Sequence, residues 1–576
     1  MLNVEALSAE YMPGLQYKTP VIRKSMQAML RVLFHEKELN RFQAQYPHLQ
    51  GFDFVEQLLE YFDFTYALRD NERERIPTRG RVVIIANHPI GTLDAAILIK
   101  LIGEVRRDVL TVTNQVLSSI KPLSPLLLPV DNLNGRSSKD QLKAMYQHLE
   151  NEGAVIIFPA GEVSRMGPAG VRDGRWHSGF LRIATATRSA ILPIHIDGRN
   201  SLFFYALSFV SYPLSTMWLV REMFKQAHRS VHVSIGNPIP FSSYQQTQLP
   251  LKTRIKLFQK HLFRIGKQKE GMFVTKTAIA HPEGRQQLRK EIHACELLGE
   301  TRDGKSIYVF DFNPDCSIMR EIGRLREIAF RAVGEGTGKR RDVDSFDRFC
   351  QQIILWDETE LEIVGAYRLR DTRNGDGNSL YSASLFDLQP DMSVYLAQGL
   401  ELGRSFVQPR YWGKRSLDYL WFGIGAYLRQ HGDVRYLFGP VSISASYPAA
   451  ARDMLVYYYS HYFASPVHGA TAKLPYRLDA TAQQQMQDTF KGDDRKTDYV
   501  TLKSHLGHLG CNVPTLFKQY SELCESGGVV FFDFNIDPDF ADCVDGLVML
   551  DVEKLKSSKR TRYIGNDRAT CKSLSG

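Results

Sequence analysis

Residues 82–94 read VVIIANHPIGTLD. The first five are apolar and mostly β-branched, which favours a buried strand, and the Asn-His-Pro-Ile-Gly segment that follows predicts a turn. Residues 154–161 (AVIIFPAG) repeat this plan, and residues 191–196 (ILPIHI) supply a third strand. Helical patterns near residues 95–105 and 180–187 separate the three strands. Strands that alternate with helices predict an α/β domain with a largely parallel sheet, whose functional loops follow the carboxyl ends of the strands.

The turn after the first strand carries His88, and Asp94 follows six positions later. A carboxylate beside a His can fix its tautomer and stabilise the imidazolium, while the other ring nitrogen takes a proton from a hydroxyl. A structural interpretation is equally concrete, because Asp94 could cap the next helix and His88 could bond to backbone in the turn. These two residues alone leave both interpretations open.

Two blocks of sequence, residues 87–94 and residues 158–165 (FPAGEVSR), together resemble the glycerolipid acyltransferase superfamily. The resemblance covers residues 75–240 and includes the apolar strand with a central Pro193. It implies that His88, supported by Asp94, deprotonates an acceptor hydroxyl that attacks an acyl thioester. It also implies that four further residues of the two blocks bind substrate, namely Asn87, Gly161, Glu162 and Ser164.

The sequence departs from the superfamily pattern in ways that bear on the acceptor. Five residues, rather than the usual four, separate His88 from Asp94, and Gly91 could absorb the extra residue as a bulge. Val163 stands where the superfamily has an Arg that serves a phosphate, and Ala160 stands where it has Glu. These differences favour an acceptor without phosphate. The Pro-Ala-Gly-Glu variant is similar to the hemolysin-type branch, which includes ornithine lipid synthases.

Charge and cysteine content divide the chain near residue 290. Residues 1–290 hold 38 Lys and Arg against 24 Asp and Glu, whereas the remainder holds 34 against 39, and all seven cysteines lie in the second part. We therefore predict two domains, residues 1–290 and 291–576. The cysteines are odd in number and form no Cys-x-x-Cys pair, and no signal-peptide pattern is visible. We expect a cytoplasmic protein with no metal site and no cofactor.

Two stretches of the first half predict its partners. Residues 201–220 carry no charge, but their Ser, Thr and Pro content favours a buried or interfacial hairpin over a spanning helix. Residues 252–290 hold eleven Lys and Arg and two Glu. Such a run is often a solvated helix face. Here it also suits the inner face of an anionic cytoplasmic membrane, as a peripheral contact, or an acidic acyl carrier protein. No nucleic-acid-reading motif accompanies the charge.

The second half predicts a GNAT-like α/β fold, with antiparallel strands followed by one helix crossover. The predicted elements are strands at 307–312, 353–356, 363–369, 400–407 and 436–443, and helices near 318–333 and 416–430. Short motifs in this order resemble the acyl-homoserine lactone synthase and ornithine N-acyltransferase branch, over residues 300–450. They are residues 325–326, 330–331, 344–347, 365–369 and 401–404.

This second resemblance implies roles for five residues. Glu401 could take a proton from an amine, and Arg404 could hold a carboxylate, although an internal Glu401–Arg404 ion pair is the alternative. Arg331, Asp344 and Asp347 are the further substrate-binding candidates. The coenzyme A signature of GNAT proteins is absent after Glu401. An acyl carrier protein is therefore the expected donor.

The two resemblances together predict a bifunctional acyltransferase. The second half would N-acylate ornithine with a 3-hydroxyacyl chain, and the first half would O-acylate the resulting lyso-ornithine lipid. Two alternatives stay open: a glycerophospholipid acyltransferase with a regulatory second domain, and a non-catalytic hemolysin-type membrane-binding protein.

Overall fold

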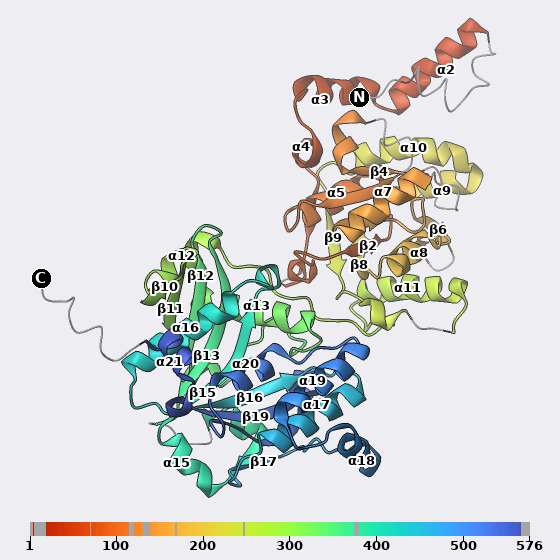
Figure 1. Ribbon diagram of the computed structural model, residues 1–576. Coiled ribbons are helices and arrows are strands. Elements are labelled where there is room, and N and C mark those ends of the chain that lie inside the picture. Colours follow the sequence, from red (N-terminus) through yellow and green to blue (C-terminus); the bar gives the residue numbers. More distant parts are fainter. Residues whose placement is uncertain are drawn as a thin grey trace, which may run out of the picture. The chain divides into compact units, whose positions relative to one another are not determined.

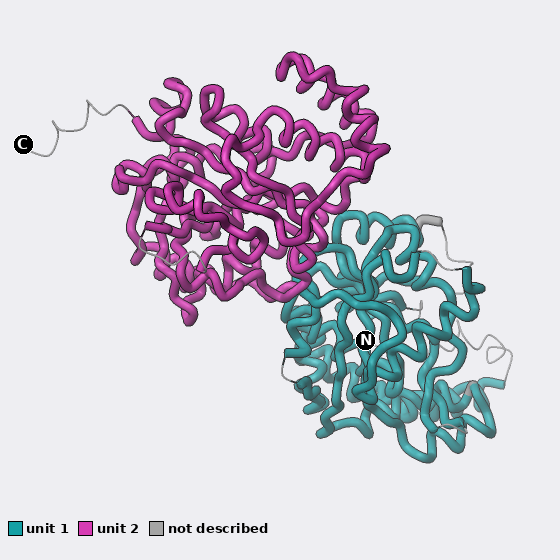
Figure 2. Tube along the Cα trace, turned by 90° about the horizontal axis from the view of Figure 1, so that it is seen from below, with its two compact units in different colours: residues 1–278 teal, residues 279–576 magenta. Residues whose placement is uncertain are grey.

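The computed structural model describes Val4 and residues 19–69, 71–113, 120–130, 139–167, 170–245, 248–373 and 379–565. The chain forms two compact units, residues 1–278 and 279–576 (Figure 2). The predicted division after residue 290 falls inside helix α12 (Arg285–Ile292). Leu288 and Ile292 of this helix pack into a core of the second unit, so α12 belongs to that unit. The boundary between the units is set by the core into which each residue packs, and the change in composition marks its position only approximately.

A seven-stranded sheet forms the centre of the first unit. Its spatial order is β1 (Thr65–Ala67), β9 (Ser230–Ile235), β8 (Ala190–Asp197), β2 (Val82–Ala86), β5 (Ala154–Ile157), β3 (Val109–Thr113) and β4 (Leu127–Pro129). Adjacent strands run parallel, apart from the antiparallel pair β8–β9. The largely parallel sheet predicted from the sequence is confirmed. It brings the ends of β2 and β5 side by side, because these two strands are direct neighbours.

Helices cover both faces of this sheet (Figure 1). Ile84 and Ile156 pack toward α4 (Gly51–Tyr61) and α5 (Thr92–Gly103). Val83 and Ile85 face the opposite way, toward α7 (Lys139–Glu150), α8 (Gly179–Ala186) and α11 (Leu251–Ile265). Burial on both faces explains why the strands read as unbroken apolar runs. The unit also contains α2 (Pro20–Leu33), α3 (Glu36–Gln45), β6 (Arg165–Gly167) and β7 (Gly170–Arg172).

The uncharged segment 201–220 forms two helices. These are α9 (Leu202–Val210) and α10 (Tyr212–Lys225), with the break at Ser211, whose backbone is extended. The pair packs together as a hairpin, as the sequence predicts. Within the described ranges, no helix has both the length and the apolar character needed to cross a membrane.

An eight-stranded sheet forms the centre of the second unit. Its order is β10 (Glu296–Glu300), β11 (Lys305–Asp311), β12 (Gln351–Asp357), β13 (Glu362–Asp371), β15 (Gly399–Val407), β16 (Tyr436–Ile443), β19 (Cys543–Asp551) and β18 (Val529–Asp537). The pair β15–β16 is parallel, and the other neighbouring pairs are antiparallel. Helix α16 (Ser416–Gln430) connects the two parallel strands. The α/β fold class predicted for both halves is confirmed.

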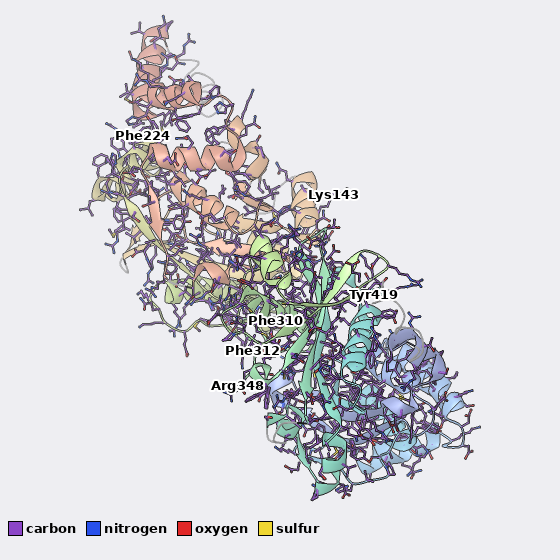
Figure 3. The ribbon with its side chains drawn as sticks, turned by 90° about the vertical axis from the view of Figure 1, so that its left-hand side faces the viewer. Lys143, Phe224, Phe310, Phe312, Arg348 and Tyr419 are labelled. Carbon is purple, nitrogen blue, oxygen red and sulfur yellow. The ribbon has the colours of Figure 1, made fainter. Side chains whose placement is uncertain are left out.

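The two faces of this sheet carry different helices. Phe310 lies on the face that packs against α13 (Ser317–Ala332), and Tyr419 of α16 belongs to the core on the other face (Figure 3). That second core also includes α17 (Ala449–Tyr462), α19 (Arg495–His508) and α20 (Thr515–Leu523). The remaining elements are α14 (Ser382–Leu385), β14 (Phe386–Leu388), α15 (Ser393–Leu396), β17 (Ala470–Ala472), α18 (Ala480–Thr489) and α21 (Ser557–Tyr563).

Candidate active sites

His88 and Asp94 are in contact where β2 ends and α5 begins. Nδ1 of His88 lies 3.0 Å from Oδ2 of Asp94. The same oxygen accepts hydrogen bonds from the backbone N–H groups of Ile90 (2.8 Å) and Gly91 (3.0 Å). Asp94 therefore caps α5 and holds His88 at once, so the two interpretations left open by the sequence describe one arrangement. With Nδ1 directed at a carboxylate, Nε2 of His88 is left to accept a proton.

Gly91 makes the longer His–Asp spacing possible. Its φ angle is +124°, a conformation that L-residues with a side chain rarely adopt. A Cβ at this position would lie 3.7 Å from the side chain of Val163, which is ordinary contact, so the requirement for glycine comes from the backbone conformation. The extra residue is accommodated at Gly91, and the contact between His88 and Asp94 is kept.

Asp173, which the sequence analysis missed, connects the two loops that carry the resemblance. Its Oδ1 accepts hydrogen bonds from Ser164 Oγ (2.5 Å) and from the backbone N–H of His88 (3.2 Å). Trp176 Nε1 donates to Oδ2 at 2.9 Å. Burial raises the pKa of Asp173, against these three hydrogen bonds, which favour its charged form. Ser164, predicted to bind substrate, is buried and serves this connection.

Asn87, like Ser164, forms hydrogen bonds inside the fold. Its amide Nδ2 donates to the carbonyl of Ile196 at 2.8 Å, and its Oδ1 accepts from the N–H of Ile196 at 2.8 Å. The side chain is buried and joins the end of β2 to β8. The structure thus places Asn87 beside His88 in the chain but directs its amide into the sheet.

A cavity of about 400 Å³ opens beside His88. Gly161 and Glu162 line it, as do apolar side chains of α4 and α5, including Leu58 and Ile99. The ring of Phe158 packs on His88 with ring centres 4.3 Å apart. At the same cavity Tyr212 of α10 donates a hydrogen bond to Glu162 at 2.6 Å, and that bond raises the pKa of Tyr212. An apolar chamber with a His–Asp pair at its edge suits a long alkyl chain whose reactive end meets Nε2 of His88.

We predict that Gly91→Ala and Gly80→Ala both lower stability, but that only Gly91→Ala also lowers catalytic activity. Both glycines have positive φ angles, +124° and +89°. Each substitution should lower the free energy of unfolding by about 1–3 kcal/mol through backbone strain. Gly91→Ala should also reduce the acyl transfer expected of the first unit at least about tenfold, because the His88–Asp94 contact shifts. Thermal unfolding and initial rates measure the two effects, and equal activity in both variants would contradict the role of Gly91.

In the second unit, three arginines meet one aspartate-rich loop. Arg326 of α13 lies 3.0 Å from Asp347, and Arg368 of β13 lies 2.8 Å from Asp344. Burial works against the charge of Asp347, but Arg326 and Arg368 outweigh it and lower its pKa to about 2. Asp344 and Asp347, predicted to bind substrate, thus fix this loop to the sheet.

Arg404 joins the same cluster through an unusual backbone. Its φ angle is +47°, at a register shift in the β13–β15 pairing. Its guanidinium lies 3.2 Å from Asp342 and 3.5 Å from Asp344, and it donates to the hydroxyl of Tyr381 at 3.1 Å. Arg331, a further predicted binding residue, lies 2.6 Å from Glu327 on its own helix.

Glu401 is buried, and both of its carboxylate oxygens bond to backbone. They accept from the N–H groups of Ser382 (2.6 Å) and Tyr381 (3.2 Å). The partners of Arg404 are the aspartates and Tyr381 described above, so the internal Glu401–Arg404 ion pair considered from the sequence is not the arrangement found. Glu401 holds Tyr381 in place, and Tyr381 in turn donates to Asp537 at 2.9 Å.

Two other carboxyl groups in this area titrate near neutral pH. Burial raises the pKa of Asp545 to about 7, with Asp537 adding to the rise and a 2.5 Å hydrogen bond from Ser442 opposing it. Removal from water raises the pKa of Glu335 to about 8, with the neighbouring Asp545 adding to the rise. A carboxyl with such a pKa can take up a proton from an amine at physiological pH. One signal in the sequence could have indicated Asp545: its carboxylate interrupts the apolar residues of β19, whose other aspartate, Asp551, stands at the strand's end.

We predict that Asp545 makes stability depend on pH. Between pH 4 and 7 the folded chain holds a proton on Asp545 that the unfolded chain has released, so the free energy of unfolding falls as pH rises, by at most about 1.4 kcal/mol per pH unit. Asp545→Asn cannot ionise and can still accept the hydrogen bond from Ser442. Its stability relative to the native chain should increase from pH 5 to 8 in urea titrations, and a constant difference would contradict the prediction.

Comparison with known proteins matches both units to acyl-transfer families. Residues 7–269 match the acyltransferase family, and residues 325–422 match the acetyltransferase (GNAT) domain. A glycine N(alpha)-acyltransferase of Bacteroides thetaiotaomicron is 33% identical over 303 residues, which are 50% of this chain and 89% of that protein. A lyso-glycine lipid O-acyltransferase of the same organism is 30% identical over 242 residues, which are 41% of this chain and 87% of that protein. An L-ornithine N(alpha)-acyltransferase of Brucella abortus is 33% identical over 172 residues, which are 25% of this chain and 61% of that protein. The chain belongs to the acyltransferase family, and it joins an acyltransferase domain in its first unit to a GNAT domain in its second.

Proposed function

We propose that this chain carries out two successive acylations that build a diacyl amino-acid lipid. The second unit transfers a 3-hydroxyacyl chain to the α-amine of ornithine, and the first unit esterifies the new lipid's 3-hydroxyl. The order follows from chemistry, because ornithine has no hydroxyl for the first unit to acylate. Relatives named as an N-acyltransferase and as a lyso-lipid O-acyltransferase support one chain that combines the two steps.

The observation that carries the O-acylation is the apolar cavity beside the His88–Asp94 pair. Nε2 of His88 takes the proton of the 3-hydroxyl as its oxygen attacks the thioester carbonyl. The C–S bond breaks, the thiolate leaves, and the proton held on His88 passes to it. Asp94 stabilises the imidazolium while the proton is on the ring. The walls of the cavity shield an acyl chain from water.

In the N-acylation, the α-amine attacks a second thioester carbonyl, and one amine proton must pass to a base. The C–S bond breaks as the amide forms, and the leaving thiolate takes the proton from that base. Glu401 is the base that the motif implies, but its oxygens already accept two backbone hydrogen bonds. Asp545 and Glu335 lie in the same area and titrate close to neutral pH. We therefore assign the positioning of Tyr381 to Glu401, and proton uptake to the Asp545–Glu335 pair.

The ionised forms of these two carboxyl groups also favour ornithine over glycine as the acceptor, because a bound cation stabilises the carboxylate and opposes the rise in its pKa. Ornithine carries a second, cationic amine, which gains from a nearby carboxylate, whereas glycine has nothing to place there. Glycine is the second candidate because relatives at 33% identity are named for it. The acyl donor in both steps is a thioester of acyl carrier protein, which suits the basic run at residues 252–290.

The α9–α10 hairpin supplies the membrane contact. Phe209 and Val210 at its turn are 73% and 83% exposed, and Leu202 is 79% exposed. Apolar side chains grouped in this way on a surface mark an interaction site. We place the hairpin in the interfacial region of the inner face of the cytoplasmic membrane, as a peripheral contact, where a lyso-lipid would be delivered.

We predict that His88→Ala stops the second step alone. Ester formation should fall about 10²–10⁴-fold, as expected for loss of a general base. The mono-acylated amide should accumulate, and mass spectrometry of lipid extracts identifies its head group as ornithine or glycine. Asp545→Asn is the matched variant in the other unit, and it should lose amide formation while still acylating supplied mono-acyl lipid. Unchanged diacyl lipid with His88→Ala would contradict the assignment.

We predict that the double variant Phe209→Ser/Val210→Ser binds vesicles of mixed zwitterionic and anionic lipid at least about tenfold more weakly than the native chain, because it loses apolar area at the interface. Met272→Ser/Val274→Ser is the control: Val274 is 78% exposed but lies outside the hairpin. Its binding should stay within about twofold of native. Equal losses in the two double variants, measured by sedimentation with vesicles, would contradict the role of the hairpin.

A further inference from the structure

A second cavity, of about 820 Å³, adjoins the one beside His88. Val130 and His177 line both cavities. Apolar side chains of α7, α8 and α11, such as Met145, Ile183 and Ile255, form part of its walls. Neither step of the mechanism above uses this space.

The polar lining of this second cavity is cationic. Arg175, Arg182, Lys252 and Lys256 line it, and no Asp or Glu is among the described residues of the lining. All four cations are exposed to solvent. Across the described ranges, none of the four forms an ion pair; elsewhere in the unit, Arg81 and Arg106, for example, are paired with carboxylates. Lys252 and Lys256 are four positions apart on α11, so they lie on one face of that helix.

The start of α8 adds to this positive potential. Gly179, its first residue, lines the cavity, and so does Ser178 before it. In the part of the chain that the structure describes, no side chain caps this helix end, and its first turn has no acidic residue. The first N–H groups of a helix are attractive to an anion.

We propose that the second cavity binds the phosphate end of the phosphopantetheine arm that carries the acyl thioester. This inference rests on the proposed function, since it presumes a thioester donor. The phosphate sits among Arg182, Lys252 and Lys256. The arm runs past His177 into the first cavity and presents the thioester carbonyl to the hydroxyl activated by His88.

Charge identifies the donor, rather than the acceptor, as the occupant. A lyso-ornithine lipid has no net charge, because its carboxylate offsets its cationic amine, so four cations attract it less than they attract an anion. A phosphate monoester or diester is anionic at neutral pH and accepts several charge-assisted hydrogen bonds. Carrier protein and coenzyme A share this phosphopantetheine chemistry.

Direct binding to the full-length chain tests the site without relying on turnover. Free 4′-phosphopantetheine should bind at least about tenfold more tightly than pantetheine, which lacks the phosphate. Lys252→Gln/Lys256→Gln should weaken phosphopantetheine binding about tenfold and leave pantetheine binding unchanged. Lys267→Gln/Lys269→Gln removes the same charge from the same basic run outside the cavity, and should change binding less than about twofold.

Enzyme kinetics distinguish the carrier-bound donor from coenzyme A, and binding of the donor from binding of the lyso-lipid. The cavity variant should raise KM for the carrier-bound donor with little change in kcat, and competition by coenzyme A shows whether the free nucleotide form uses the same site. Equal binding of phosphopantetheine and pantetheine, equal effects of the two double variants, or a rise in KM for the lyso-lipid instead would overturn the inference. Phosphate-dependent binding without any acyl transfer would overturn the proposed function and leave the site standing. Acyl transfer without phosphate-dependent binding would overturn the inference about the second cavity and leave the proposed function standing.

Discussion

One oxygen of the buried Asp94 carboxylate organises the proposed active site of the first unit. Oδ2 accepts hydrogen bonds from two backbone N–H groups at the start of α5 and meets Nδ1 of His88. A buried carboxylate is stable only while such donors surround it, so the turn, the helix start and the ring orientation depend on one another. Gly91 permits the backbone to close around that oxygen. Asp173 then attaches the neighbouring loop to the same turn through Ser164 and the backbone of His88.

In the second unit, arginines stabilise the carboxylates of one loop. Arg326, Arg368 and Arg404 come from a helix and two strands, and they bind the loop that contains Asp342, Asp344 and Asp347. Because these charges neutralise one another, the cluster shapes the site rather than reacting in it. The carboxyl groups of Asp545 and Glu335 lie close to Arg404 but keep raised pKa values. The aspartates of the cluster are neutralised by arginines, whereas Asp545 and Glu335 have raised pKa values, and this difference supports the assignment of proton uptake to the latter pair.

Much of this architecture could be predicted from local sequence. The strand Val82–Ala86 matches its predicted range, because its apolar run ends at the Asn-His-Pro turn. The helix Ser416–Gln430 matches the helix predicted near these residues, because Gly432 follows its last turn. The strand Tyr436–Ile443 also matches its predicted range. Local pattern could not reveal Asp173, whose importance arises from burial and from contacts over a long sequence separation. For Asp545 it shows a carboxylate among apolar residues, but not the burial that raises the pKa. The same limit applies to Asn87 and Ser164, which look exposed in a loop motif yet bond inside the fold. The change in composition predicts a division inside α12, because composition does not report packing, and packing places α12 in the second unit.

The central claim is that two separate active sites act in sequence on one lipid. The most direct test divides the chain between Ala278 and Ile279, where the two compact units meet in sequence, and assays each half alone. Residues 279–576 should convert ornithine and a 3-hydroxyacyl thioester into the mono-acylated amide. Residues 1–278 should leave free ornithine unchanged and esterify supplied mono-acyl lipid. Amide formation by residues 1–278, or a folded second half that forms no amide, would contradict the account.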